Sequence, residues 1–158
     1  MTTPAKVRTC LWFDTEGEDA ANFYVSLLPD SFIESASRPD PTGPTLAVEF
    51  TLAGTPYMTL NGGPHFDHSP AASISVLTKD QAETDTLWDA LTRNGGTPSQ
   101  CGWLTDRFGV SWQIVPEVLP SLMTSDDKAA AQRAHAKMLT MDKIDIAALE
   151  AAYKGEGS

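Results

Sequence analysis

The chain has 158 residues, of which 41% are hydrophobic and 20% are charged, so it is long enough and apolar enough to fold as one globular domain. Its 21 acidic and 11 basic side chains give a formal net charge of −10. Nucleic acid and membrane are therefore excluded as expected partners, because phosphate backbones and anionic headgroups repel a strongly acidic protein.

The first half of the chain predicts one strand, one helix and three further strands. Apolar and polar residues alternate over 7–13, which is typical of a strand. Apolar residues at helical spacing over 17–28 predict an amphipathic helix that Pro29 ends, and Asp14 is a plausible cap for it. Three β-like runs separated by turn-forming Pro and Gly residues follow, at Phe32–Ser37, Leu46–Leu52 and Thr55–Leu60.

The same order of elements begins again after a loop that ends near Pro70. A short strand over 73–78 comes first, and Asp80 with Glu83 three residues later forms an acidic version of a capping box for a second helix. The strands after that helix are expected within 97–105 and 110–115. This internal repeat predicts two modules of the same build, at about 6–66 and about 70–118.

The last part of the chain predicts helices that belong to neither module. An alanine-rich stretch over 126–139 and a second stretch over 142–153 have helical character. Neither is long or apolar enough to be stable alone, so both must dock on the core or on a second subunit. We expect one domain over 1–158, with a helical extension at about 120–154.

The N-terminal residues give no sign of export. Met1 to Lys6 are polar, and the apolar stretch after them reaches Asp14 too soon for a signal peptide or a membrane span. Cys10 and Cys101 belong to no C-x-x-C pair and form no secreted disulfide framework. We therefore expect a cytoplasmic protein with reduced thiols.

One long stretch resembles a known family. Residues Cys101 to Pro116 resemble the C-G-W-x-x-D-x-F-G-x-x-W-Q-I-x-P signature of PhnB-like proteins, often labelled 3-demethylubiquinone-9 3-methyltransferase, of the vicinal oxygen chelate superfamily. Supporting patterns occur at 12–14, 22–24 and 141–146. The resemblance implies an α+β fold of paired βαβββ modules, as in glyoxalase and bleomycin resistance proteins. Their curled sheets surround a cleft, and a second chain usually completes a homodimer.

The resemblance also indicates where metal-using relatives place their ligands. These positions correspond approximately to Val7, Asn61, Ser73 and Gln113 in this chain. Valine cannot bind a metal ion, and Asn, Ser and Gln are poor neutral ligands compared with His or Glu. We therefore expect no metal and no other cofactor.

Other residues offer chemistry only in weak patterns. His65 and His68, with Asp67 between them, could hold zinc or nickel, but no third or fourth ligand follows at the usual spacing, and a solvated loop explains them too. Cys101 could be a nucleophile, although nothing in the sequence pairs a base with it, and a small buried thiol is the simpler interpretation. No glycine-rich turn for S-adenosylmethionine and no phosphate-binding loop occurs, so no catalytic motif is identified.

Tryptophans on the predicted strands are the candidates for a ligand site. Aromatic side chains supply contact area, an amide can fix orientation, and an arginine can clamp a carboxylate. The same tryptophans could instead belong to the core, and Arg107 could be a solvated turn residue. The expected ligand-binding residues are Trp12, Asn61, Trp103, Arg107, Trp112 and Gln113.

The resulting hypothesis is a metal-independent homodimer whose cleft binds an apolar or aromatic small molecule. Bleomycin-resistance relatives sequester a drug in this way, so the resemblance supports this mode. The alternative is a metal-dependent lyase, isomerase or dioxygenase of the vicinal oxygen chelate superfamily, with ligands such as His65 and His68. A third hypothesis is an interaction module built on the C-terminal helices.

Overall fold

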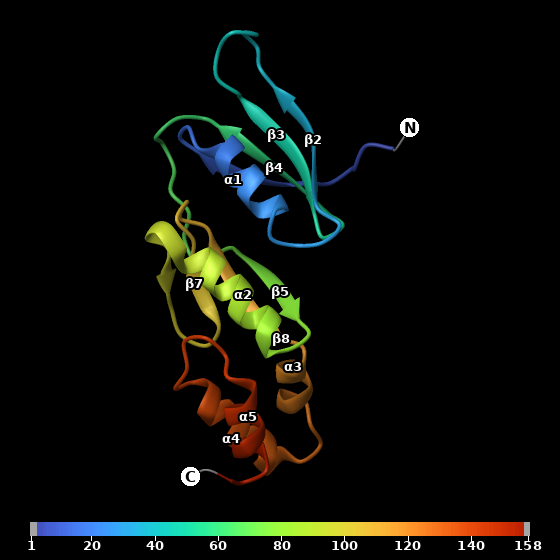
Figure 1. Ribbon diagram of the computed structural model, residues 1–158, viewed down its shortest axis with the longest axis vertical. Coiled ribbons are helices and arrows are strands. Elements are labelled where there is room, and N and C mark those ends of the chain that lie inside the picture. The colour runs from blue at the N-terminus through green and yellow to red at the C-terminus, as the bar shows by residue number, and fades with distance from the viewer. Residues whose placement is uncertain (1–2, 157–158) are drawn as a thin grey trace. The chain divides into compact units, whose positions relative to one another are not determined.

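The computed structural model describes residues 3–156. Within them the chain divides into two compact units, with the division between His68 and Ser69. Each unit contains one four-stranded sheet, in which the unit's first strand lies next to its last. Figure 1 shows a helix on each sheet, α1 in the first unit and α2 in the second. Both units have the predicted βαβββ order, and the fold is α+β.

The first unit consists of five elements. Its sheet has the order β1-β4-β3-β2, with β1 parallel to β4 and the other neighbours antiparallel. Parallel strands need a long connection, which here contains α1 and the two strands of the sheet that follow it. The elements are β1 (Thr9–Phe13), α1 (Gly17–Val25), β2 (Phe32–Ser37), β3 (Ala47–Leu52) and β4 (Thr55–Asn61).

Alternation of side chains decides which face of the first sheet the helix covers. Every second residue of β3 is buried, namely Val48, Phe50 and Leu52. Tyr24 of α1 is also fully buried, with its ring 6.3 Å from the ring of Phe50. The other residues of β3, such as Glu49, remain partly exposed. We call the side that bears these alternate residues the open face of the sheet.

The second unit begins with the same arrangement. Its sheet has the order β5-β8-β7-β6, with β5 parallel to β8. The predicted cap at Asp80 is confirmed, because its side chain accepts a hydrogen bond from the backbone N–H of Glu83 at 2.9 Å. The Glu83 carboxylate accepts from the N–H of Lys79 at 3.1 Å, one residue before the N-cap. The elements are β5 (Ser73–Thr78), α2 (Gln81–Thr92), a 3₁₀ turn (Arg93–Gly95), β6 (Thr97–Pro98), β7 (Trp103–Thr105) and β8 (Ser111–Pro116).

Three helices follow β8 and dock on the second unit. They are α3 (Val118–Met123), α4 (Lys128–Met138) and α5 (Ile146–Tyr153). The helices and the loop before α5 share a hydrophobic cluster whose buried members are Leu119, Met141, Ile144 and Leu149, and Val115 of β8 packs against it. Apolar contact with the sheet therefore stabilises helices that are too short to form alone. Among residues 3–156, no helix combines the length and apolar character needed to cross a membrane.

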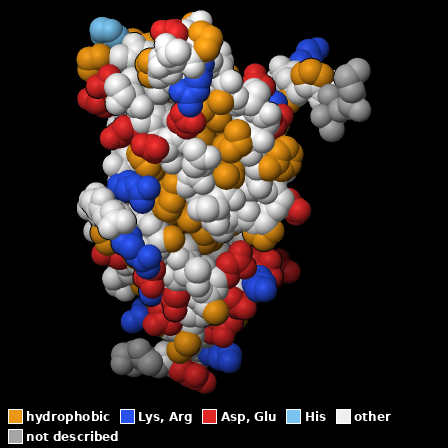
Figure 2. All heavy atoms as spheres, turned by 45° about the horizontal axis from the view of Figure 1, so that its top comes forward, with side chains coloured by type: hydrophobic (Ala, Val, Ile, Leu, Met, Phe, Trp, Pro, Cys, Tyr) orange, Lys and Arg blue, Asp and Glu red, His pale blue; other side chains and the backbone are white. Residues whose placement is uncertain are grey.

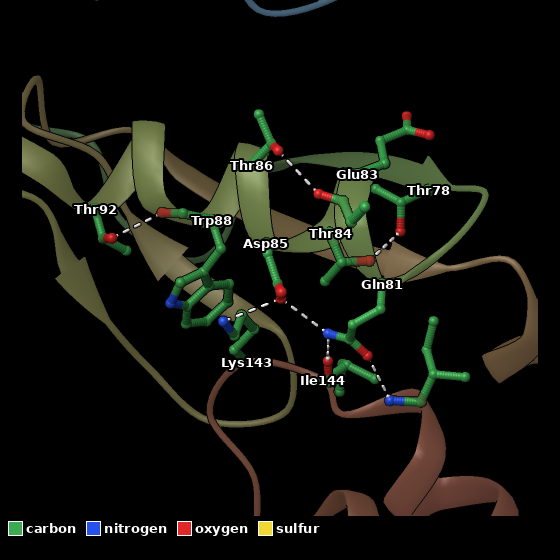
Figure 3. A network of polar contacts seen from close by, with 12 residues as sticks. Thr78, Gln81, Glu83, Thr84, Asp85, Thr86, Trp88, Thr92, Lys143 and Ile144 are labelled. Carbon is green, nitrogen blue, oxygen red and sulfur yellow. Dashed lines mark hydrogen bonds and ion pairs between the residues drawn. The ribbon is translucent and has the colours of Figure 1, made fainter.

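A polar network joins α2 to the segment before α5 (Figure 3). The side-chain amide of Gln81 donates to the carbonyl of Ile144 at 3.0 Å and accepts from the backbone N–H of Ile146 at 2.8 Å. Asp85 of α2 forms an ion pair with Lys143 at 3.0 Å. This network positions the chain that leads into the last helix.

The first strand and the first helix are shorter than predicted. β1 begins at Thr9, because Val7 has no partner on β4 and is 78% exposed. α1 ends at Val25, because the N–H groups of the next residues bond to carbonyls three residues back, which tightens the last turn. Both differences lie at element ends, where hydrogen bonding is incomplete.

One further prediction about the helices was wrong, and one helix was missed. Asp14 does not cap α1, because the N-cap is Glu16 and its side chain makes no capping hydrogen bond. α3 was not predicted, because its six residues include Pro120 and follow Pro116. Proline is tolerated in the first turn of a helix, where its missing N–H has no intrahelical partner.

Candidate functional site

A pocket of about 360 Å³ lies in the first unit, beside the ends of β1 and β4. Its walls come from the loop between β1 and α1, the loop between β2 and β3, and the last residue of β4. Sites for small molecules typically measure roughly 300–1,000 Å³, so a small organic ligand would fit. The lining residues are Asp14, Thr15, Pro39, Asp40, Pro44, Thr45, Leu46 and Asn61.

A tight turn shapes the wall that the β2–β3 loop provides. Pro41 and Gly43 favour a turn, which closes with a 2.9 Å hydrogen bond from the N–H of Gly43 to the carbonyl of Asp40. Asp40 Oδ1 also accepts from the backbone N–H of Thr42 at 3.0 Å and from its hydroxyl at 2.9 Å. The bond from the backbone N–H is the main reason that the pKa of Asp40 is lower than usual. Asp40 is therefore charged and fixed in place at neutral pH.

Asn61 connects the three stretches of chain that line the pocket. Its Oδ1 accepts from the N–H of Gly17 at 2.8 Å, and its Nδ2 donates to the carbonyls of Thr15 at 3.2 Å and Thr45 at 3.1 Å. A side chain at position 17 would place its Cβ 2.7 Å from Asn61 Oδ1, so glycine permits this close approach. Asn61, which the sequence predicts as a ligand-binding residue, thus lines the pocket with its amide already engaged by backbone groups.

Glu18 ties the β2–β3 loop to α1 next to the pocket. Its carboxylate accepts hydrogen bonds from Arg38 at 3.1 and 3.2 Å and from the hydroxyl of Thr45. Arg38 also donates to the carbonyl of Gly43 at 3.1 Å. The positive charge of Arg38 is therefore paired with Glu18, and its side chain is held against the β2–β3 loop.

The two ionisable side chains that line the pocket are both carboxylates. Asp14 and Asp40 are exposed, and no Lys or Arg is among the lining residues. Within residues 3–156, no hydrogen bond or ion pair engages the side chain of Asp14. Acidic side chains are also widespread on the face of the molecule shown in Figure 2, in keeping with the net charge of −10. The pocket is therefore electronegative.

Trp12 lies on the open face of the first sheet, away from this pocket. It is half-buried, and its indole N–H donates to the carbonyl of Gly63 at 3.0 Å. The ring of Phe66 meets it edge-on, with centroids 5.0 Å apart. A Cβ at Gly62 would lie 2.2 Å from the indole, so the glycine allows the loop after β4 to lie on the ring. This loop covers part of the surface that Trp12 would offer a ligand.

Trp103 and Gln113 are brought together on the open face of the second sheet. They are direct partners on β7 and β8, and both are half-buried. The amide of Gln113 donates to the hydroxyl of Ser73 at 2.9 Å. An indole beside an oriented amide could contact a planar polar ligand, but no pocket that we describe includes either residue.

Trp112 belongs to the core of the second unit. It is 0% exposed and pairs with Leu104 on the side of the sheet that α2 covers. Its indole N–H donates to the buried carboxylate of Asp106 at 2.8 Å. In this position Trp112 contributes to stability, and a ligand could reach it only if the core opened.

Arg107 lies in the turn between β7 and β8. Its side chain is exposed, and its guanidinium carbon lies 4.7 Å from the centre of the Phe108 ring. This cation–π contact is within the range that holds an arginine over an aromatic face. Arg107 is thus partly positioned by its own turn, and its predicted role as an anion clamp stays a prediction.

The histidine loop, residues 65–68, packs against the end of β1 through His68. His68 Nε2 lies 2.7 Å from the carbonyl of Trp12, so this nitrogen must carry the proton and donate it. The ring of His68 also lies 5.2 Å from that of Phe13. His65 is exposed. In the part of the chain that the structure describes, no three His, Cys, Asp or Glu side chains are grouped to hold a metal ion.

The positions that correspond to metal ligands in relatives do not fit a metal. Val7 offers only hydrocarbon, and the amide of Asn61 is occupied by three backbone groups. Gln113 and Ser73 are hydrogen-bonded to each other. Neutral, mutually satisfied groups of this kind cannot replace the imidazoles and carboxylates that divalent ions require.

The two cysteines lie in different units of the chain. Cys10 and Cys101 are free thiols. Partial burial raises the pKa of the Cys10 thiol, which reduces the fraction of nucleophilic thiolate at neutral pH. Cys101 is half-buried in a turn, where its backbone N–H donates to the carbonyl of Met141 at 2.7 Å.

Comparison with known proteins identifies the family. A family model described as 3-demethylubiquinone-9 3-methyltransferase matches residues 5–115, which is more than half of the chain. The chain belongs to this family. The match to the 3-demethylubiquinone-9 3-methyltransferase family model ends within β8.

Solved structures support the same assignment. A PhnB protein from Bacillus cereus is 33% identical with a TM-score of 0.65, over 71% of this chain and 99% of that one. A protein from Pseudomonas aeruginosa is 22% identical with a TM-score of 0.59, over 72% of this chain and 98% of that one. The fosfomycin resistance protein FosX from Mesorhizobium loti is 11% identical with a TM-score of 0.56, over 78% of this chain and 100% of that one. The last two support the fold alone. The predicted PhnB-like family and vicinal oxygen chelate fold are confirmed. No curated protein sequence matches the chain.

The sequence predictions missed most of the pocket. Of the residues predicted to bind a ligand, Asn61 is the one that lines it. The stretch around Asp40 reads as a turn because of its Pro and Gly residues, and Asp14 reads as a helix cap. The sequence does contain an acidic residue in each of the two loops that line the pocket, Asp14 and Asp40. That these two loops lie at the same pocket, beside the parallel pair β1 and β4, becomes clear only from the structure.

Proposed function

We propose that the protein binds a small organic molecule in the first-unit pocket without the help of a metal ion. The observation that carries this proposal is a pocket of about 360 Å³ whose walls are already held in place. Asn61 and the turn at Asp40 fix the surrounding backbone by hydrogen bonds within the protein. A preformed site spends little binding free energy on ordering its own loops.

Metal-dependent chemistry receives no support from the donor groups. Positions used by metal-binding relatives carry Val7, Asn61, Ser73 and Gln113, and the polar ones are hydrogen-bonded within the protein. A lyase, isomerase or dioxygenase that depends on a metal would need ligands from other residues. A metal-dependent reaction step is therefore not part of the proposed function.

The methyltransferase description of the family is likewise not the activity that we propose. The usual S-adenosylmethionine fold needs a glycine-rich turn between a strand and a helix at the edge of a parallel sheet. The turn between β1 and α1, residues 14–16, has no glycine, and Gly17 is the first residue of α1. Within residues 3–156, each sheet has one parallel pair of strands. Binding of a small molecule explains the pocket and requires no site for S-adenosylmethionine.

A fragment screen followed by NMR tests this function on the full chain. With ¹⁵N-labelled protein, binding fragments should shift the backbone amides of Thr15, Leu46 and Asn61. Substitution Thr15→Trp should fill the pocket and remove these shifts, whereas Thr55→Trp, at an exposed position at the start of β4, should not. Shifts confined to Trp12, or to Trp103 and Gln113, would instead place the ligand on an open face and overturn the proposed site.

The homodimer implied by the family resemblance is also part of this proposal. Light scattering on the purified chain should give twice the mass of one chain across a tenfold dilution. A single-chain mass at the highest concentration would contradict the homodimer. Because every lining residue of the pocket belongs to one chain, fragment binding should persist in either case.

A further inference from the structure

We propose that the first-unit pocket selects ligands that carry an ammonium group next to an apolar body. This inference rests on the proposed function of the same pocket and adds the chemical class of the ligand. It depends on three features of the pocket and its surroundings: two carboxylates in the lining, a neighbouring arginine that is paired with Glu18, and apolar side chains in the lining.

The carboxylates are placed to receive a cation. Asp40 is fixed by two hydrogen bonds from Thr42, and both bonds go to Oδ1. Its Oδ2 receives no hydrogen bond from residues 3–156 and remains available. Asp14 brings a second carboxylate from the β1–α1 loop. Both carboxylates line the pocket, and an ammonium group offers three N–H donors to such acceptors.

The nearby arginine cannot serve an anion in the same way. Arg38 precedes the lining residue Pro39, but Nη2 is bonded to both oxygens of Glu18 and Nη1 to the carbonyl of Gly43. An anionic ligand would compete with the Glu18 carboxylate for this guanidinium and would also approach Asp14 and Asp40. Like charges at close range are repelled, so the site discriminates against carboxylates and phosphates.

The rest of the lining favours an apolar body. Pro39, Pro44 and Leu46 present hydrocarbon to the pocket, and Leu46 is 40% exposed although it is a leucine. Covering these side chains with a ligand would remove apolar surface from water, which is favourable in proportion to the area buried. The net charge of −10 would also raise the local concentration of a cationic ligand near the protein.

Three probes with the same ring and different charge test this inference. Benzylamine is cationic at pH 7, benzyl alcohol is neutral and benzoate is anionic. Titration of the full ¹⁵N-labelled chain at low salt should show that benzylamine shifts the amides of Thr15, Thr42 and Leu46 and that its dissociation constant rises with salt. Benzyl alcohol should shift them at higher concentrations, and benzoate should leave them unchanged.

Isosteric substitutions then assign the selectivity to the carboxylates. Asp40→Asn keeps an oxygen that can accept from Thr42, so the turn should survive while the charge is lost. Each of Asp14→Asn and Asp40→Asn should weaken benzylamine binding by about fivefold, the upper end of what an exposed ion pair contributes. The double variant should bind benzylamine no better than benzyl alcohol. Asp67→Asn, an exposed acid outside the lining, is the matched control and should bind as the parent does.

The outcomes separate the ligand class from the binding function. Equal shifts of the pocket amides by benzoate, or unchanged benzylamine affinity in the double variant, would overturn the cationic class while the pocket remained a binding site. Absence of pocket shifts with all three probes and throughout the fragment screen would overturn the proposed function itself.

Discussion

At the scale of single residues, Asp106 holds the β7–β8 turn from inside the core. The residue is 2% exposed, and its Oδ1 accepts from the N–H groups of Phe108 at 2.8 Å and Val110 at 3.1 Å. Its Oδ2 accepts from the indole of Trp112 at 2.8 Å. A buried carboxylate is costly unless hydrogen bonds compensate for lost hydration, and here both oxygens are compensated.

We expect Asp106→Asn to lower the free energy of unfolding by about 2–3 kcal/mol. Asparagine has one acceptor oxygen, so its NH₂ group must face either the turn N–H groups or the indole of Trp112. Urea denaturation followed by tryptophan fluorescence measures this loss. Asp89→Asn, an exposed position on α2, is the control and should stay within about 0.5 kcal/mol of the parent. Equal stability of the two variants would show that the buried bonds contribute nothing.

Ala53 shows backbone strain at a single position. It occupies the left-handed region with φ of 47°, next to Gly54 at 84°, in the two-residue turn between paired Leu52 and Thr55. Two positive φ values in such a turn are typical of a type I′ hairpin, which favours Asn-Gly.

Substitution Ala53→Asn should therefore raise the free energy of unfolding by about 0.5–1 kcal/mol, because asparagine tolerates the left-handed region better than alanine does. Thermal melts give the comparison. Ala71→Asn, at an exposed loop position without a positive φ, should leave the melting temperature nearly unchanged. If both substitutions had the same effect, backbone strain would not be its cause.

At the scale of elements, α2 organises the C-terminal helices through one side chain. Gln81 bonds the carbonyl of Ile144 and the N–H of Ile146, in addition to Asp85 on its own helix. The same segment reaches the sheet, because the N–H groups of Cys101 and Gly102 donate to the carbonyls of residues 141 and 142 at 2.7 Å. Loss of Gln81 should loosen all these contacts together.

Gln81→Ala should accelerate hydrogen exchange at the amides of Cys101 and Gly102 and lower stability by about 1–2 kcal/mol. The amides of the first unit should exchange at the parent rate, since Gln81 makes its contacts within the second. Gln132→Ala, on the exposed side of α4, controls for the loss of an amide side chain. Unchanged exchange at Cys101 would contradict a positioning role for Gln81.

The elements show where sequence patterns succeed and fail. Period-two alternation over 7–13 located β1, in which Leu11 and Phe13 are buried and Trp12 between them is only half-buried. The sequence patterns did not predict α3, because Pro116 precedes it and Pro120 interrupts it. Its stability comes from contacts of Leu119 within the hydrophobic cluster. The pocket was not predicted for a related reason. Tertiary contacts made by Asn61 bring the loops of the pocket together, and local composition does not encode those contacts.

At the scale of the whole molecule, the excess of acidic groups makes stability depend on pH. Glu34 and Arg8 form a two-pronged contact in which both distances are 2.7 Å. The hydrogen bond from Arg8 holds the pKa of Glu34 below its ordinary value, and the bond from Gln81 does the same for Asp85. A carboxyl pKa that folding lowers adds stability above the unfolded value and loses it as pH falls through the folded value.

Glu34→Gln should therefore reduce the urea midpoint at pH 7, and its difference from the parent should shrink as pH falls below about 4.3, the ordinary pKa of glutamate. The two proteins should become similar once the pH is below the lowered folded pKa of Glu34, because both then carry a neutral side chain at this position. Glu150→Gln on α5, which is exposed, should follow the parent at every pH. A constant difference between Glu34→Gln and the parent would mean that packing, and not charge, is responsible.

The repeat of two similar units has a consequence for stoichiometry. In the first unit the chain between the second and third strands runs from residue 38 to 46 and supplies five of the eight lining residues of the pocket. In the second unit the matching connection, residues 99–102, is a tight turn. A duplicated architecture has thus kept a binding loop in one copy and a minimal link in the other. Isothermal titration with a tight ligand should accordingly saturate at one equivalent per chain, and two equivalents would reveal a site that the shorter copy builds by other means.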